Sequence, residues 1–74
     1  GGKVAMEVPG QGVFVYNTAN GTWQHPTTTN ASELDIDEAG EVAMEIPNQG
    51  VYLYDTNSGT WQHPTTTNAT LVAG

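Results

Sequence analysis

The stretch KVAMEVPGQGVFVYNTANGTWQHPT at residues 3–27 returns as EVAMEIPNQGVYLYDTNSGTWQHPT at residues 41–65. When the chain is aligned with itself at an offset of 38 residues, 22 of the 30 positions from Gly2 to Ala31 are identical. The eleven residues from Gly21 to Ala31 recur without any change. A period near 40 residues is typical of proteins built from stacked units, in which each unit buries its faces against its neighbours. The sequence therefore predicts two copies of one structural unit.

Each copy is predicted to contain short strands and no helix. Residues 32–37 alternate polar and apolar, residues 41–46 carry alternate apolar side chains, residues 51–54 are apolar throughout, and residues 60–63 form a last strand that Pro64 ends. Glycine, asparagine and proline lie between these strands, as hairpin turns require. Because residues 51–54 are apolar at every position, we expect this strand to be covered on both faces.

Four antiparallel strands within one repeat are typical of a β-propeller blade. We predict an all-β propeller fragment with two blades per chain. Blade one spans residues 1–30 and holds strands b, c and d, whereas blade two spans residues 31–69 and holds strands a to d with the connector. Residues 70–74 are predicted to be an inner strand that completes blade one of a neighbouring chain. Propellers close with about four to eight blades, so we expect a homo-oligomeric ring, with a homotrimer favoured and a homotetramer next.

One part of the repeat also resembles a known family. The segment LDIDEAGEVAMEIPNQGVYLYD, residues 34–55, resembles blades of the integrin-like FG-GAP and VCBS repeats. Their pattern is D-x-D-x-D-G-x-x-D, followed by an apolar strand, a glycine hairpin and a second strand. The resemblance implies a propeller blade. The presence of two blades per chain is also similar to small oligomeric propeller lectins, in which three chains build six blades.

In the FG-GAP and VCBS family, the aspartates of the first turn bind calcium. Asp35, Asp37 and Gly40 match that pattern, whereas Ala39 and Ala43 occupy the other ligand positions. Calcium takes six to eight oxygen ligands, so two carboxylates form only a degenerate calcium-like turn. We expect no metal and no cofactor. The acidic cluster, six of the eight acidic residues within residues 33–45, is expected to keep the assembly soluble.

Charge and composition exclude several function classes. The net charge is −7, with a single lysine and no arginine, so we expect no nucleic-acid partner and no anionic membrane surface. The chain has no cysteine for a thiolate zinc site or a thiol nucleophile. Each copy has one histidine without a serine nucleophile beside it, and no pair of carboxylates is set apart as glycosidases require. We therefore expect a protein that is not an enzyme.

The candidate binding residues recur as a triplet in both copies. They are Trp23, Gln24 and His25, and Trp61, Gln62 and His63. The tryptophans either cover the contact between neighbouring blades or form a stacking platform for a sugar, and the two roles are compatible. Along a strand, Trp and His face one side and Gln faces the other, so only one set can line a given pocket. The histidines are expected to be partly exposed near the rim.

Two glutamates interrupt an otherwise apolar strand. Glu7 and Glu45 occupy equivalent positions in the two copies. We expect them to be solvated near the axis of the ring, with hydrogen bonding to a ligand as the alternative.

Two function classes follow from the pattern of repetition. The first is a non-enzymatic, self-assembling propeller with repeated equivalent pockets for glycans. The second is a structural scaffold without a natural ligand, either designed or reconstructed. Eleven residues stay unchanged while other strands differ, which favours the glycan-binding module.

Overall fold

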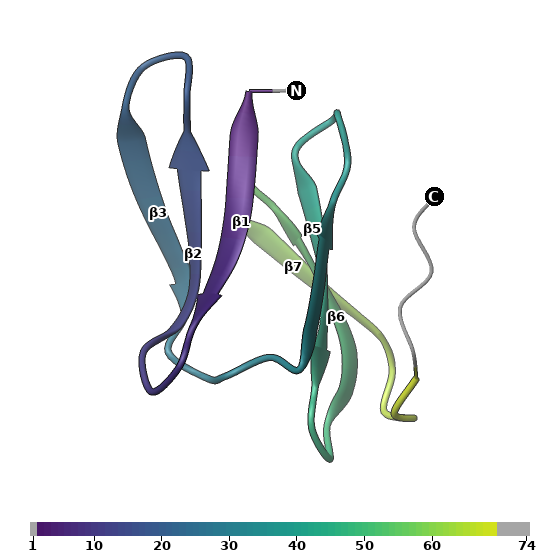
Figure 1. Ribbon diagram of the computed structural model, residues 1–74. Coiled ribbons are helices and arrows are strands. Elements are labelled where there is room, and N and C mark those ends of the chain that lie inside the picture. Colours follow the sequence, from purple (N-terminus) through teal and green to yellow (C-terminus); the bar gives the residue numbers. More distant parts are fainter. Residues whose placement is uncertain (1, 70–74) are drawn as a thin grey trace.

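The computed structural model describes residues 2–69 (Figure 1). Sheet one contains β1 (Lys3–Val8), β2 (Gly12–Asn17) and β3 (Thr22–Thr27) in that order. Sheet two contains β4 (Glu33–Ile36), β5 (Glu41–Ile46), β6 (Gly50–Asp55) and β7 (Thr60–Thr65) in that order. All neighbouring strands are antiparallel, which confirms the all-β prediction. The predicted inner strand at residues 70–74 lies outside the described residues. Between residues 2 and 69, no helix is long and apolar enough to cross a membrane.

Left-handed backbone closes the hairpin between β1 and β2 and the hairpin between β5 and β6. Gly10 has φ 80° and its repeat counterpart Asn48 has φ 66°. Glycine enters this region freely and asparagine tolerates it, so asparagine can replace glycine at this position of the repeat. Gly50, at the start of β6, has φ 99°, and a Cβ atom there would overlap the carbonyl oxygen of Thr65. Close approach of β7 therefore requires glycine at residue 50.

The last strand of each sheet contains a proline. β7 continues beyond Pro64, so the prediction that this residue ends the strand is wrong. Leu53 pairs with Gln62 and Val51 pairs with Thr65, which leaves one extra residue on β7 between the two pairs. β7 is also an edge strand, and at an edge or a β-bulge the missing N–H of proline is tolerated. The proline of β3 lies in the same bulge of sheet one.

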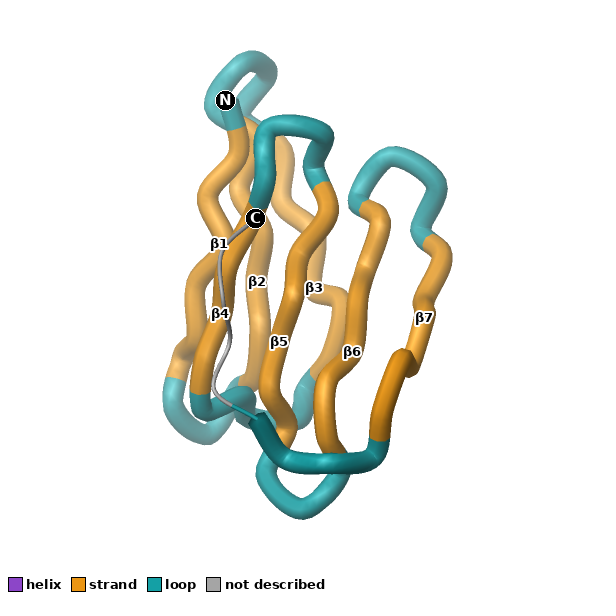
Figure 2. Tube along the Cα trace, turned by 90° about the vertical axis from the view of Figure 1, so that its right-hand side faces the viewer, coloured by secondary structure: helices purple, strands orange, loops and turns teal. Residues whose placement is uncertain are grey.

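The two sheets pack face to face, and the core lies between them (Figure 2). Val13 and Val15 of β2 are fully buried there, as are Val42 and Met44 of β5, each at 0–1% exposure. We call this contact between sheet one and sheet two the seam. Strand alternation accounts for it, because residues two apart on a strand point to the same face.

The outer face of sheet two is only partly covered. Val51 and Leu53 of β6 lie on this face and are partly buried, whereas Tyr54 on the seam face is buried. The expectation that residues 51–54 are covered on both faces is therefore only partly met within one chain. The seam covers one face of β6, and no described segment covers the other face to the same degree.

Candidate functional site

Each repeat places a histidine flat against an aromatic ring of the neighbouring strand. The His63 and Tyr52 rings stack with centroids 3.8 Å apart and planes 10° from parallel. His25 and Phe14 repeat this arrangement at 3.9 Å and 8°. His63 Nε2 lies 2.8 Å from the backbone carbonyl oxygen of Gln49. Because a carbonyl oxygen only accepts, Nε2 donates this bond, and Nδ1 is then the acceptor nitrogen of the neutral ring.

The tryptophan of each repeat leans on the same aromatic cluster. Trp61 lies 4.8 Å from the ring of Tyr54 and meets Tyr52 edge-on at 6.2 Å and 87°. Offset and edge-to-face contacts of this kind are favourable for aromatic rings. Trp61 is nevertheless 41% exposed, and its counterpart Trp23 is 57% exposed. The tryptophans thus pack on the sheet and still present ring surface to solvent, so both predicted roles are open to them.

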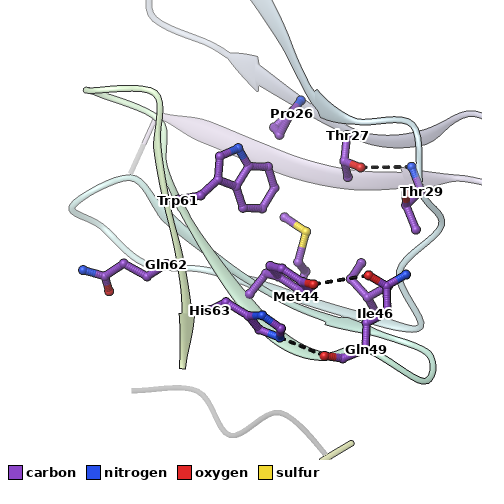
Figure 3. Close-up of a pocket in the computed structure, with 10 residues that line it drawn as sticks. Pro26, Thr27, Thr29, Met44, Ile46, Gln49, Trp61, Gln62 and His63 are labelled. Carbon is purple, nitrogen blue, oxygen red and sulfur yellow. Dashed lines mark hydrogen bonds between the residues drawn. The ribbon is translucent and has the colours of Figure 1, made fainter. Parts of the chain in front are cut away.

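A pocket of about 440 Å³ opens at the seam next to Trp61. Figure 3 shows Trp61 and His63 on one side of it and Pro26 and Thr27 of sheet one on the other. The remaining lining comes from Thr29, Met44, Ile46, Gln49, Tyr52 and Gln62. The volume lies within the range of about 300–1,000 Å³ that is usual for small-molecule sites. Both repeats therefore contribute walls to one pocket.

The two glutamines of the candidate site lie apart from the rings. Gln24 Nε2 donates to the backbone oxygen of Thr56 at 3.1 Å, across the seam. The side chain of Gln62 points away from Trp61 and His63 (Figure 3). The rings of Trp61 and His63 line the seam pocket, and Gln62 belongs to its lining although its side chain points away from them. Gln24 instead joins the two sheets.

The first repeat carries a similar but more open hollow. It has a volume of about 360 Å³ and is lined by Met6, Val8, Gln11, Phe14, Trp23 and His25. All of these residues belong to sheet one or to its hairpin. His25 Nε2 donates to the carbonyl oxygen of Gln11 at 2.8 Å, as in the second repeat. This hollow has the aromatic floor of the seam pocket without an opposing sheet.

The two glutamates within the apolar strands hold the chain segments that follow each repeat. Glu45 is only 4% exposed, and its Oε1 accepts a hydrogen bond from the backbone N–H of Ala69 at 3.0 Å. Glu7 Oε1 accepts from Ala31 N–H at 2.8 Å. The expectation of solvated glutamates is therefore wrong for Glu45, because a buried acceptor satisfies the backbone of the connector. Glu7 Oε2 is buried and has no hydrogen-bond partner among residues 2–69.

Backbone N–H groups of the calcium-like turn are hydrogen-bonded to Asp37. Asp37 Oδ1 accepts from the N–H of Glu41 at 2.9 Å, and Asp37 also closes the turn through Gly40 N–H. Asp35 pairs with Ala43 inside the β4–β5 ladder. Across residues 2–69, no three histidine, aspartate or glutamate side chains converge as a metal site. In this turn, the Asp37 carboxylate serves the fold.

Sequence reasoning missed several walls of the seam pocket. Tyr52 and Gln49 form and brace the histidine stack, and Tyr52 OH donates to Gln49 Oε1 at 3.2 Å. Tyr52 could have been found, because it lies two residues from Tyr54 and must share a face with it. Thr27 and Thr29 come from the other repeat, and their place depends on how the two sheets pack, which no pattern within one repeat specifies.

No protein-family model matches the chain, and no significant match to a curated protein or to a solved structure was found. The resemblance to FG-GAP and VCBS blades therefore stays a prediction.

Proposed function

We propose that this protein is a non-enzymatic, lectin-like module of the β-propeller type that binds glycans in the seam pocket. One observation carries the proposal: the exposed ring of Trp61 borders a pocket of about 440 Å³ whose wall is the Tyr52–His63 stack. A sugar ring has an apolar face of C–H groups and a rim of hydroxyls. Aromatic rings suit the first feature, and a few fixed polar groups suit the second.

Polar groups surround the aromatic wall. The Thr27 hydroxyl accepts from Thr29 N–H at 3.0 Å and still carries a proton to donate. In the neutral ring, Nδ1 of His63 is an acceptor, because Nε2 donates to the backbone carbonyl oxygen of Gln49. These groups supply both donors and acceptors for sugar hydroxyls. The histidine ring is also held in one orientation, which lowers the entropy lost when a ligand binds.

The same proposal includes a ring of blades. Sheet one would gain its fourth strand from residues 70–74 of a neighbouring chain, and three chains, or next four, would close the ring. A single shallow pocket of this kind should bind weakly, near the ~4 kcal/mol of a millimolar complex. Simultaneous contact of several pockets with a glycan-coated surface would raise apparent affinity by about 10²–10⁴. Multivalent glycans are therefore the expected ligands.

The second candidate function is a structural scaffold without a ligand. The specific observation in its favour is that polar groups of the repeated triplet already have partners within the chain. Gln24 is bonded to Thr56, and His63 is bonded to Gln49. A scaffold needs these bonds for folding alone.

A glycan array and a fluorescence titration test the proposal. Trp23→Phe leaves Trp61 as the only tryptophan, so emission then reports the seam pocket directly. We expect a multivalent glycan to change this emission, and we expect Trp61→Ala to lose bead agglutination at least tenfold. Circular dichroism and native mass measurement must first show that the variants keep their sheets and assembly.

The control is Asn20→Ala, which lies in the turn between β2 and β3, away from the pocket. It should bind as the unaltered protein does. An assembled protein that binds nothing on the array would favour the scaffold. Unchanged agglutination by Trp61→Ala would contradict the aromatic platform.

A further inference from the structure

The two outer faces of the chain are near-copies of the two faces that form the seam. On the seam, sheet one contributes Val13, Val15 and Gln24, and their repeat counterparts are Val51, Leu53 and Gln62 on the outer face of sheet two. Sheet two contributes Val42, Met44, Tyr54 and Trp61, and their counterparts are Val4, Met6, Tyr16 and Trp23 on the outer face of sheet one. The chain thus exposes both halves of an interface that it also contains in assembled form.

Equivalent residues differ sharply in burial between the seam and the outer faces. Val42 is 0% exposed, whereas Val4 at the equivalent position is 46% exposed. Met44 is fully buried and Met6 is only partly buried. Side chains of nearly the same type are therefore packed on one side of the molecule and open to water on the other. Apolar surface of this kind gains about 25 cal/mol per Å² when it is removed from water.

Within residues 2–69, no strand pairs with the β1 edge of sheet one. β5 is flanked by β4, but its counterpart β1 is the edge strand of its sheet. An open backbone edge of this kind is a site where another chain can add a strand.

We infer that the outer face of sheet two of one copy packs on the outer face of sheet one of the next copy, head to tail, and repeats the seam. This inference rests on the ring assembly within the proposed function. The new seam would complete the open hollow of the first repeat. Trp23 and His25 would form its floor, and Pro64 and Thr65 of the second copy would take the places that Pro26 and Thr27 take in the seam pocket. The assembled protein then has a second pocket that no single chain contains.

Two of the repeat differences fall on one contact across the seam. Lys3 Nζ donates to Asn57 Oδ1 at 3.0 Å and to Thr56 Oγ1 at 2.8 Å. At the equivalent contact between copies, Glu41 would face Ala19. The lysine and its amide partner thus change together, to glutamate and alanine. The lysine contact would therefore occur in the seam within a chain and be lacking in the seam between chains.

Cysteine cross-linking tests the inference, because the chain has no cysteine. The test variant carries Ala19→Cys with Glu41→Cys, and the matched control carries Lys3→Cys with Asn57→Cys. With a short bis-maleimide, the control should cross-link within one chain. The test variant should give a series of linked chains on a denaturing gel. The largest linked species should give the number of copies in the ring. A test variant that stays single while the control cross-links would overturn the inference.

A mixing experiment tests the head-to-tail interface without a cross-linking reagent. Phe14→Asp disrupts the outer face of sheet one, and Leu53→Asp disrupts the outer face of sheet two. Each variant alone should be monomeric by native mass spectrometry, and an equimolar mixture should form a dimer of one copy of each. Assembly of either variant alone, or a mixture that stays monomeric, would contradict a head-to-tail interface.

Binding stoichiometry separates this inference from the proposed function. We expect two glycan sites per chain in the assembled protein and one in the Leu53→Asp monomer, measured by calorimetry. Cross-linked copies that bind no glycan would refute the proposed function and leave the shared seam in place. Glycan binding at one site per chain, without cross-linking, would refute this inference and the ring assembly, and would leave glycan binding in the seam pocket in place.

Discussion

Truncation of the two equivalent methionines measures whether the outer face of sheet one is covered in solution. Met44 is 0% exposed and belongs to the seam core together with Val13 and Val42. Removing a fully buried methionine side chain costs about 2–5 kcal/mol, and a core of this size supplies only ~3–5 kcal/mol in total. Met44→Ala should therefore remove about 3 kcal/mol, which is most of the stability of the fold.

Met6→Ala is the matched variant. In an isolated chain Met6 is partly exposed, so its truncation would cost only about 1 kcal/mol, in line with its smaller loss of buried surface. In the head-to-tail assembly it occupies the position of Met44, and the two variants should then agree within about 1 kcal/mol. We expect this second result for the assembled protein.

Urea unfolding followed by tryptophan fluorescence provides the assay. With a urea dependence of about 1 kcal/mol per molar for a small protein, each variant should lower the unfolding midpoint by roughly 3 M. Both must be compared at the same protein concentration, since assembly makes the midpoint concentration-dependent. A large effect of Met44→Ala with almost none for Met6→Ala would refute the covered outer face. A small effect of both would show that the seam is not close-packed.

Three further perturbations follow from individual contacts. Gly50→Ala should lower the free energy of unfolding by about 1–3 kcal/mol, measured in urea, because φ 99° and the nearby β7 carbonyl exclude a Cβ atom. Gly10→Asn copies the residue of the other repeat and should be nearly neutral. Glu45→Ala should speed hydrogen exchange at the amide of Ala69 and cost about 1–3 kcal/mol, whereas Glu45→Gln keeps an acceptor oxygen and should lose less. One millimolar calcium should hardly move the melting temperature, because the acidic cluster holds no converging ligand set within residues 2–69; a rise of ten degrees that chelation reverses would show a real calcium site.

Much of the fold could be predicted from strand alternation and turn residues. The apolar positions of residues 41–46 place Val42 and Met44 on one face, and the structure buries that face. The prediction that the strand after Gly59 ends at Pro64 was wrong. A proline usually stops a strand, but an edge position and a bulge remove the requirement for its N–H. Exceptions of this type depend on the neighbouring strand, which a single segment does not describe.

The candidate site was harder to predict, because it draws on both repeats. Alternation correctly separates Gln62 from Trp61 and His63. The threonine wall comes from the end of β3 and the connector that follows it, and only the packing of the sheets places it there. The unchanged residues from Gly21 to Ala31 also carry structural contacts, since Gln24 joins the sheets and the Ala31 amide is held by Glu7. Identity between repeats therefore marks folding requirements as well as candidate binding residues.

Lys3 has a practical consequence for anyone who attaches this protein to a surface. It is the only lysine in the chain, and its ammonium group is bound at the seam by Thr56 and Asn57. Amine-reactive dyes and sensor chips that couple through lysine would thus modify a structural contact instead of a free handle. A single cysteine at Ser58, in the exposed turn between β6 and β7, would provide a site for thiol labelling that leaves the sheets untouched.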